Sequence, residues 1–223
     1  HFKGDIKELN DLAKHIGRLT KKLKNYPVKE FKSHPKFFSN SSYEILKLIN
    51  KKNFKFKKKF EKYTKNIQKY LPEIISLFER YKIFNLKKNR NKINHIDLHP
   101  HNIITKNNKV QAIIDIDSCK VVGEGYAIAY NALKVCKQTV LYNKKKFNKK
   151  EVISKFMYNL KKEYKLDKNI TNNLYYLAIS EVLRRLTYMF KLTINHNDRK
   201  WNKVIPIQLG HLDECKEFFL KKP

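Results

Sequence analysis

The sequence is poor in cysteine and glycine. It has three cysteines among 223 residues, Cys119, Cys136 and Cys215, an odd number with wide spacing. Such a set matches neither a disulfide framework nor a zinc knuckle, which favours a reducing compartment, the cytoplasm. With five glycines and no stretch rich in Gly or Ser, the chain also offers no flexible linker between domains. We therefore expect one cytoplasmic domain.

Long apolar runs are missing as well. The longest are short segments such as Tyr126 to Tyr130, whereas a membrane-spanning helix needs about 20 apolar residues. The first residues, His1 to Asp5, contain no apolar segment typical of a secretory signal. We expect no membrane partner.

Negative charge is scarce, with 20 Asp and Glu against 50 Lys and Arg, so that the formal net charge is +30. A strongly positive surface attracts nucleic acid. However, the excess consists of 44 Lys and only 6 Arg, together with 23 Asn, and arginine is the residue that contacts bases and phosphates in bidentate fashion. This bias is typical of an AT-rich genome, so we consider a nucleic-acid partner unlikely. A basic nucleic-acid-binding module using lysine-rich segments such as 51–60 remains an alternative.

The chain does contain enough apolar residues for a closed core. Hydrophobic residues make up 41% of it, including 14 Phe and 13 Tyr, which argues against disorder. Apolar residues recur with helical spacing over much of its length, whereas residues 91–117 hold short β-like runs around the turn Asn107-Asn108. We predict an α+β fold, mostly α-helical, with a small β-hairpin of 103–105 and 110–116. The predicted helices are 5–24, 41–50, 56–70, 72–81, 126–141, 149–164, 171–193 and 203–220.

Ionisable residues are concentrated in the middle of the chain, and one interpretation of them is a zinc-dependent hydrolase. His95, Asp97, His99 and His101 alternate, so on a regular strand all four would share one face and ligate zinc. Pro100 argues against that strand, because proline removes a ladder hydrogen bond and is confined to edges and bulges.

The other interpretation is phosphoryl transfer. This chemistry needs a carboxylate that orients or deprotonates a hydroxyl, and oxygen ligands for Mg²⁺. Asp97 and Asn102 supply a carboxylate and an amide on one loop, and Asp115 lies near the end of the second strand of the predicted hairpin. Because an antiparallel hairpin returns its second strand beside the start of its first, Asp115 is expected near Asn102. Magnesium prefers such hard oxygen ligands.

The segment from His95 to Ile104, HIDLHPHNII, followed by Ile113-Ile114-Asp115-Ile116-Asp117, resembles the catalytic core of the aminoglycoside phosphotransferase/choline kinase family. The family has a protein-kinase-like fold and transfers the ATP γ-phosphate to hydroxyls of small molecules. The resemblance implies ATP and Mg²⁺ as cofactors and a small-molecule hydroxyl acceptor as partner. It implies Asp97 as catalytic base, His95 as loop-anchoring catalytic-site histidine, Asn102 and Asp115 as nucleotide-side magnesium ligands, and Asp117 as a further acidic metal residue.

The same resemblance implies an organisation of the chain. Ile16-Gly17-Arg18-Leu19 resembles the start of the family's C-terminal lobe, so residues 1–223 correspond to that lobe alone. Residues of about 27–90 would be inserted acceptor-side helices, 91–117 the catalytic loop and metal hairpin, and 118–223 the helical C-terminal part. The N-terminal lobe, with its phosphate-binding loop, is absent from this chain, so we expect the fragment alone to be inactive. The family's aspartate that buttresses the loop is missing from the stretch after Gly123.

The acceptor pocket is expected to lie between the inserted helices and the C-terminal ones. Glu181, Arg184, Arg185, the run 196–199 and Trp201 are polar or aromatic residues that can line it. Alternatively, the two arginines are simply solvated on an exposed helix face, and 195–202 is an ordinary polar loop.

Overall fold

The computed structural model of the chain describes residues 1–31, 91–144, 146–196 and 199–220. The helices predicted at 41–50, 56–70 and 72–81, and most of the inserted segment 27–90, lie outside these residues. The chain divides into two compact units. The first comprises residues 1–34, 89–178 and 214–223, and the second comprises residues 35–88 and 179–213.

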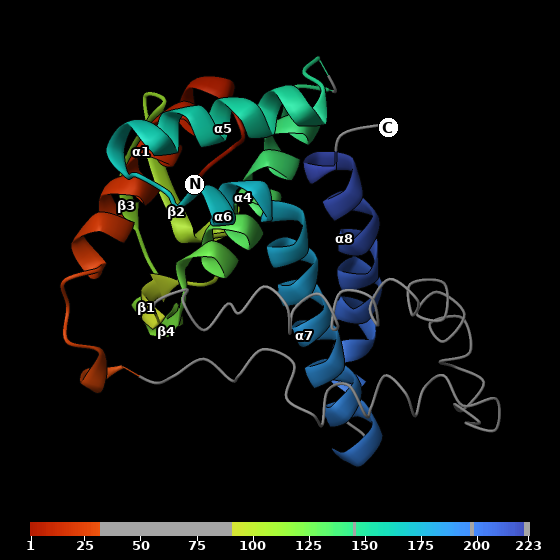
Figure 1. The fold of residues 1–223 in the computed structure, drawn as a ribbon. Coiled ribbons are helices and arrows are strands. Elements are labelled where there is room, and N and C mark those ends of the chain that lie inside the picture. The colour runs from red at the N-terminus through yellow and green to blue at the C-terminus, as the bar shows by residue number, and fades with distance from the viewer. Residues whose placement is uncertain (32–90, 145, 197–198, 221–223) are drawn as a thin grey trace. The chain divides into compact units, whose positions relative to one another are not determined.

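Helices make up most of the described chain, and the strands form two small antiparallel sheets (Figure 1). This confirms the predicted α+β fold class. The elements, in order, are α1 (Ile6–Leu23), η1 (Val28–Glu30), β1 (Asn91–His95), η4 (Pro100–Asn102), β2 (Ile103–Lys106), β3 (Lys109–Ile113), η5 (Ile116–Ser118), β4 (Cys119–Gly123), α4 (Glu124–Tyr142), α5 (Lys149–Glu163), α6 (Lys168–Asn172), α7 (Leu174–His196), η6 (Arg199–Lys203) and α8 (Val204–Phe219). The helix predicted over 171–193 is present as α7, but it begins at Leu174, because Asn173 separates it from the short helix α6.

Helix α1 begins where the sequence predicts. The Asp5 side chain accepts a hydrogen bond from the Lys7 backbone N–H (2.7 Å) and so caps one of the unpaired amides of the first turn. The buried Glu8 does not complete a capping box with Asp5. It accepts hydrogen bonds from the backbone N–H groups of Lys3 (2.9 Å) and Gly4 (3.1 Å), which fixes the chain just before the helix.

Helices α1 and α5 lie side by side, and Gly17 permits their close approach (Figure 1). A Cβ atom at this position would lie 2.9 Å from the carbonyl oxygen of Leu160 and 2.9 Å from the Cβ of Glu163. Real Cβ atoms are essentially never this close to other heavy atoms, so only glycine fits. The glycine of the Ile16-Gly17-Arg18 motif therefore has a packing role.

The predicted hairpin is present as β2 and β3, with Ile103 opposite Ile113. Asn107 and Asn108 both have positive φ, 52° and 60°, which is the conformation of a two-residue type I′ turn. The second strand is shorter than predicted, because it ends at Ile113 and not at Ile116. The sequence did not indicate β4, whose antiparallel pairing with β1 sets His95 opposite Cys119.

Helix α4 is buried along most of its length. Its residues from Gly125 to Leu133 are all buried, without the alternation of a surface helix. Polar side chains on such a helix must find partners inside the protein. Asn131 and Lys134, which lie one turn apart on α4, find theirs in the loop that follows β1.

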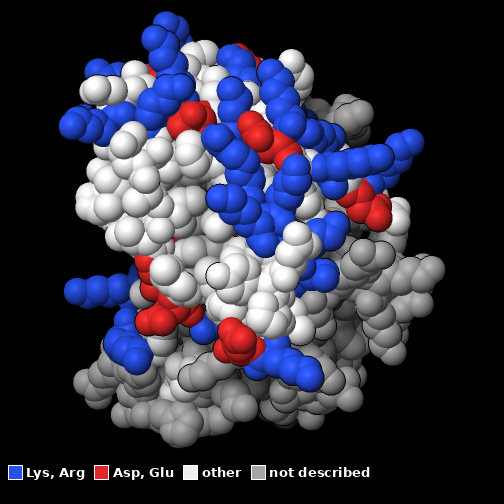
Figure 2. Space-filling model, turned by 90° about the vertical axis from the view of Figure 1, so that its left-hand side faces the viewer, with Lys and Arg blue, Asp and Glu red and all other residues white. Residues whose placement is uncertain are grey.

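The surface is rich in lysine, but acidic side chains are interspersed. Figure 2 shows Lys and Arg gathered over the upper part of one face, with Asp and Glu among them. On α5, for example, Lys155 pairs with Glu151 (2.8 Å). Within the described residues, no helix has the length and apolar character needed to cross a membrane.

Candidate active site

His95 anchors the loop that connects β1 to β2. Its ring is buried, with Nε2 3.0 Å from the carbonyl oxygen of Ile114 and Nδ1 3.3 Å from the backbone nitrogen of Asp97. The carbonyl requires Nε2 to donate, so Nδ1 accepts from the Asp97 N–H. Burial lowers the pKa of His95 and favours this neutral tautomer. The geometry is that of an anchoring residue.

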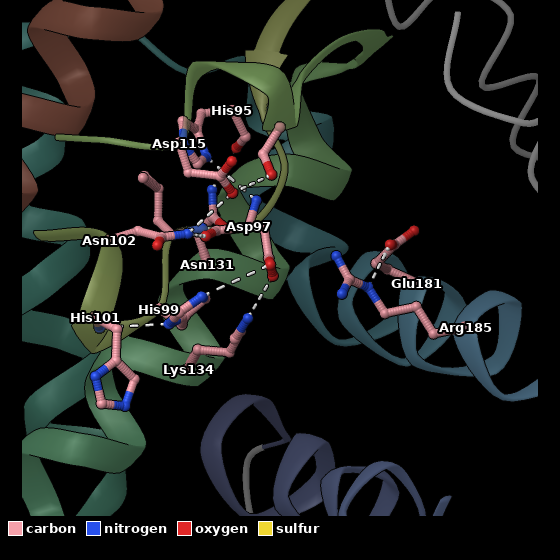
Figure 3. Close-up of polar contacts among 12 residues, drawn as sticks. His95, Asp97, His99, His101, Asn102, Asp115, Asn131, Lys134, Glu181 and Arg185 are labelled. Atoms are coloured by element: carbon pink, nitrogen blue, oxygen red, sulfur yellow. Dashed lines mark hydrogen bonds and ion pairs between the residues drawn. The ribbon is translucent and has the colours of Figure 1, made fainter. Parts of the chain in front are cut away.

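The support that the sequence analysis found missing from this loop is supplied by Asn131 of α4 (Figure 3). Its Oδ1 accepts a hydrogen bond from the backbone N–H of Leu98 (3.0 Å), and its Nδ2 donates to the carbonyl oxygen of His95 (2.7 Å). The side chain is only 2% exposed. The loop is therefore buttressed by an amide in place of the family's aspartate. Motif comparison missed this residue, and its signal was a lone polar side chain within an apolar helix.

Replacing Asn131 with Ala is expected to destabilise the protein by about 2–6 kcal/mol, because two buried backbone groups lose their partners at about 1–3 kcal/mol each. Thermal unfolding measures this. Asn131→Asp is the matched variant, because an aspartate still accepts from Leu98 but, when ionised, cannot donate to His95. The thermal unfolding midpoint of Asn131→Asp should lie between those of Asn131→Ala and the unsubstituted protein. A thermal unfolding midpoint of Asn131→Ala equal to that of the unsubstituted protein would contradict the buttressing role.

Asp97 is half-buried and paired with a lysine that the sequence analysis did not consider (Figure 3). Lys134 Nζ of α4 lies 2.5 Å from Asp97 Oδ1, and the two side chains are 15% and 28% exposed. His99 Nε2 lies 3.9 Å from the other carboxylate oxygen, Oδ2. Burial, followed by the nearby charge of Lys134, lowers the pKa of His99, so its ring is neutral at physiological pH.

Asn102 and Asp115 lie together, as the predicted hairpin geometry requires. The amide nitrogen of Asn102 donates to the Asp97 carbonyl (2.9 Å) and to Asp115 Oδ2 (3.2 Å). Asp115 Oδ2 also accepts from the Ser118 hydroxyl (2.6 Å), a contact that the sequence analysis missed. These bonds leave Asn102 Oδ1 and Asp115 Oδ1 without a hydrogen-bond partner among the described residues. An amide oxygen and a carboxylate oxygen side by side fit Mg²⁺, which completes its shell with water and phosphate.

The backbone at Asp115 differs from the prediction. Asp115 lies beyond the end of β3, in the left-handed conformation with φ 66° and ψ 55°, and it is exposed. The strand position expected from a second hairpin strand over 110–116 is therefore wrong. Left-handed backbone in a residue other than glycine is uncommon and concentrates at functional sites.

Asp117 belongs to η5 and is exposed. Its backbone oxygen accepts a hydrogen bond from Lys120 Nζ (2.6 Å), but its carboxylate has no hydrogen-bond partner among the described residues. The contacts therefore do not connect it to Asn102 and Asp115.

The contacts do not favour the zinc interpretation. No group of three or more His, Cys, Asp or Glu side chains in the described parts of the chain is arranged to hold a metal ion. Both ring nitrogens of His95 are engaged by backbone groups, and His101 is exposed. Pro100 starts the short helix η4, so the four residues do not share one face of a strand.

Glu181, Arg184 and Arg185 form an ion-pair cluster in the second unit. Glu181 is buried and binds Arg184 through both carboxylate oxygens (2.7 and 2.8 Å) and Arg185 through one (2.9 Å). The interpretation of two arginines on an exposed helix face is therefore wrong. Trp201, another residue expected to line the acceptor pocket, is half-buried, and its ring nitrogen has no hydrogen-bond partner within the part of the chain that the structure describes.

Comparison with known proteins identifies the fold. No model of a known protein family matches the sequence, and no curated protein is similar to it. Several solved structures are similar to it, two of them complexes of a kinase and of a phosphotransferase. One is amicoumacin kinase hAmiN in complex with AMP-PNP, Ca²⁺ and Ami, with a TM-score of 0.59, 14% identity, and coverage of 99% of this chain and 62% of that chain.

The other is the GDP complex of aminoglycoside 2′-phosphotransferase-IIIa, with a TM-score of 0.50, 14% identity, and coverage of 94% of this chain and 62% of that chain. The chain thus spans less than two thirds of the length of either structure. Both are small-molecule kinases by name, and the chain shares the helix-rich architecture of the part that it matches. The residues described here have an aminoglycoside-phosphotransferase-like kinase fold.

Proposed function

We propose that this chain carries the catalytic loop and the metal-binding residues of a kinase that transfers the γ-phosphate of ATP to a hydroxyl of a small metabolite or antibiotic-like acceptor. The convergence of Asp97, Asn102 and Asp115 carries this proposal. Two hydrogen bonds from the Asn102 amide join the backbone of Asp97 to the carboxylate of Asp115. Within an aminoglycoside-phosphotransferase-like fold, the proposal is supported by a half-buried carboxylate, Asp97, near two side-chain oxygens that suit a hard cation, Asn102 Oδ1 and Asp115 Oδ1.

In this mechanism, the acceptor hydroxyl is oriented by the Asp97 carboxylate. As the acceptor oxygen bonds to the γ-phosphorus, its proton passes to Asp97, and the bond between the γ-phosphorus and the bridging oxygen breaks toward ADP. The transition state of phosphoryl transfer is loose, so catalysis depends mainly on positioning and charge neutralisation. Asn102 Oδ1 and Asp115 Oδ1 would hold Mg²⁺, which neutralises charge on the phosphates when bound.

Neighbouring residues hold Asp97, Asn102 and Asp115 in this relative position. His95 ties the start of the loop to the end of β3, and Asn131 ties it to α4. Ser118 holds the Asp115 carboxylate. The loop and the hairpin therefore meet at a fixed geometry, which a displacement reaction requires within a fraction of an ångström.

The rest of the nucleotide site is proposed to lie outside these 223 residues. Amicoumacin kinase and aminoglycoside 2′-phosphotransferase-IIIa are both longer than this chain, which covers 62% of each. We propose that a lobe with a phosphate-binding loop and an ATP-binding lysine completes the enzyme in the cytoplasm, and that this chain alone is inactive. Among acceptors, a polycationic one is disfavoured by the formal charge of +30.

Release of ADP tests the proposal. The full-length gene product is incubated with Mg-ATP and pooled small hydroxyl compounds, and ADP is measured with and without the pool. We expect acceptor-dependent ADP, and deconvolution of the pool then names the acceptor class. A folded full-length protein that binds Mg-ATP but releases no ADP with any broad pool would contradict the proposal.

A further inference from the structure

Lys134 forms an ion pair with Asp97, the residue that the proposed function uses as its catalytic base. Its Nζ is 2.5 Å from Asp97 Oδ1 and 5.2 Å from the centre of the Tyr130 ring, which is almost fully buried. The ammonium is thus held between a carboxylate and the face of an aromatic ring, both of which attract a cation.

The pair differs from the ion pairs of the protein surface. Exposed pairs are screened by water and cost side-chain entropy, so they contribute little. Lys134 is 15% exposed, and it lies on a buried helix that already holds the catalytic loop through Asn131. Two side chains one turn apart on α4 therefore fix the same loop. Asn131 forms a hydrogen bond with the loop backbone, and Lys134 forms an ion pair with the carboxylate of Asp97.

We infer that Lys134 is a positioning residue that holds Asp97 Oδ1 and so fixes the orientation of the carboxylate that takes the proton of the acceptor hydroxyl. This inference rests on the proposed function. The proton passes from the acceptor oxygen to the Asp97 carboxylate as the bond from that oxygen to phosphorus forms, and the electrons of the breaking bond leave with ADP. A cation beside the base weakens it, which this reaction tolerates because a loose transition state requires little proton abstraction.

Substitution of Lys134 in the full-length gene product tests the inference. Lys134→Met keeps the length of the side chain without its charge, and Lys134→Arg keeps the charge. For Lys134→Met, we expect kcat to fall about 10- to 100-fold, the cost of a displaced catalytic group, while KM for ATP changes less than about threefold, because binding is untouched. In Lys134→Arg, kcat should be close to that of the unsubstituted protein, because the positive charge is retained.

Lys137→Met is the matched control. Lys137 lies on the same helix, is 31% exposed and pairs with Glu214 (2.7 Å), away from the loop. We expect its kcat to be unchanged. Thermal midpoints of all variants are measured together, since a loss of kcat that follows a loss of folded protein would indicate a structural role and overturn the inference.

The outcomes separate this inference from the proposed function. If the unsubstituted protein releases acceptor-dependent ADP and Lys134→Met retains its kcat, the inference is overturned while the proposed function stands. Equal losses in Lys134→Met and Lys137→Met, or a rise in KM without a fall in kcat, also overturn it. If the unsubstituted protein transfers no phosphate, the proposed function fails first, and the inference fails with it.

Discussion

Replacing Asp97 with Asn is expected to lower the acceptor-dependent turnover of the full-length gene product by about 100- to 10,000-fold, the usual contribution of a positioned acid or base. Asparagine has the same shape but cannot take the proton of the acceptor hydroxyl at neutral pH. The backbone contacts of residue 97 with His95 and Asn102 do not involve the carboxylate, so the loop should keep its path. Release of ADP at saturating ATP measures the effect.

Glu151→Gln is the control for loss of one carboxylate. Glu151 is half-exposed on α5 and pairs with Lys155, so its change should leave turnover unaltered. The thermal midpoint of Asp97→Asn is measured as well, because the substitution also removes the partner of Lys134. A folded Asp97→Asn protein that turns over within about tenfold of the unsubstituted one would contradict the role of Asp97, since that is below the range expected for such a group.

Asp115→Ala is expected to abolish the dependence of nucleotide binding on magnesium. Asp115 lies beside Asn102, and contacts among the described residues engage its Oδ2 but leave its Oδ1 open. Without it, a single amide oxygen remains, which cannot compete with water for Mg²⁺. We expect affinity for Mg-ATP to fall about 100-fold, or about 2.8 kcal/mol at 1.4 kcal/mol per factor of ten. Calorimetric titration with and without Mg²⁺ measures it.

Asp117→Ala is the matched variant, because it removes an exposed carboxylate two residues away. The resemblance predicts a metal role for Asp117, whereas the contacts show only its backbone engaged. Equal losses of affinity for Mg-ATP in Asp115→Ala and Asp117→Ala would indicate that Asp117 is also a magnesium ligand. Magnesium-dependent binding that is unchanged in Asp115→Ala would contradict the cation site assigned to Asp115 and Asn102.

Local interactions explain what the sequence predicted well. The start of α1 next to Asp5, the helical spacing of α1 and the Asn107-Asn108 turn each depend on residues a few positions apart. Such features follow from backbone propensity and hydrogen bonding within one segment. The pairing of Glu181 with Arg184 and Arg185 is also local, at spacings of three and four residues on a helix. Only the burial of this ion-pair cluster could not be predicted without the tertiary structure.

The candidate site was partly predictable for the same reason. Asp97 and Asn102 are on one loop, and a short hairpin brings Asp115 to them, so spacing was sufficient to expect all three together. The left-handed backbone of Asp115 and its hydrogen bond from Ser118 were not predicted, because they depend on where β3 ends.

The sequence by itself determined most helices of the described residues, the hairpin and the grouping of Asp97, Asn102 and Asp115, because these depend on neighbours along the chain. The tertiary structure decided which distant residues support that group. Asn131 lies 33 residues beyond Leu98, and Lys134 lies 37 residues beyond Asp97. No spacing rule connects residues so far apart, because their contact depends on how α4 packs behind the loop, and packing is the summed result of the whole buried core.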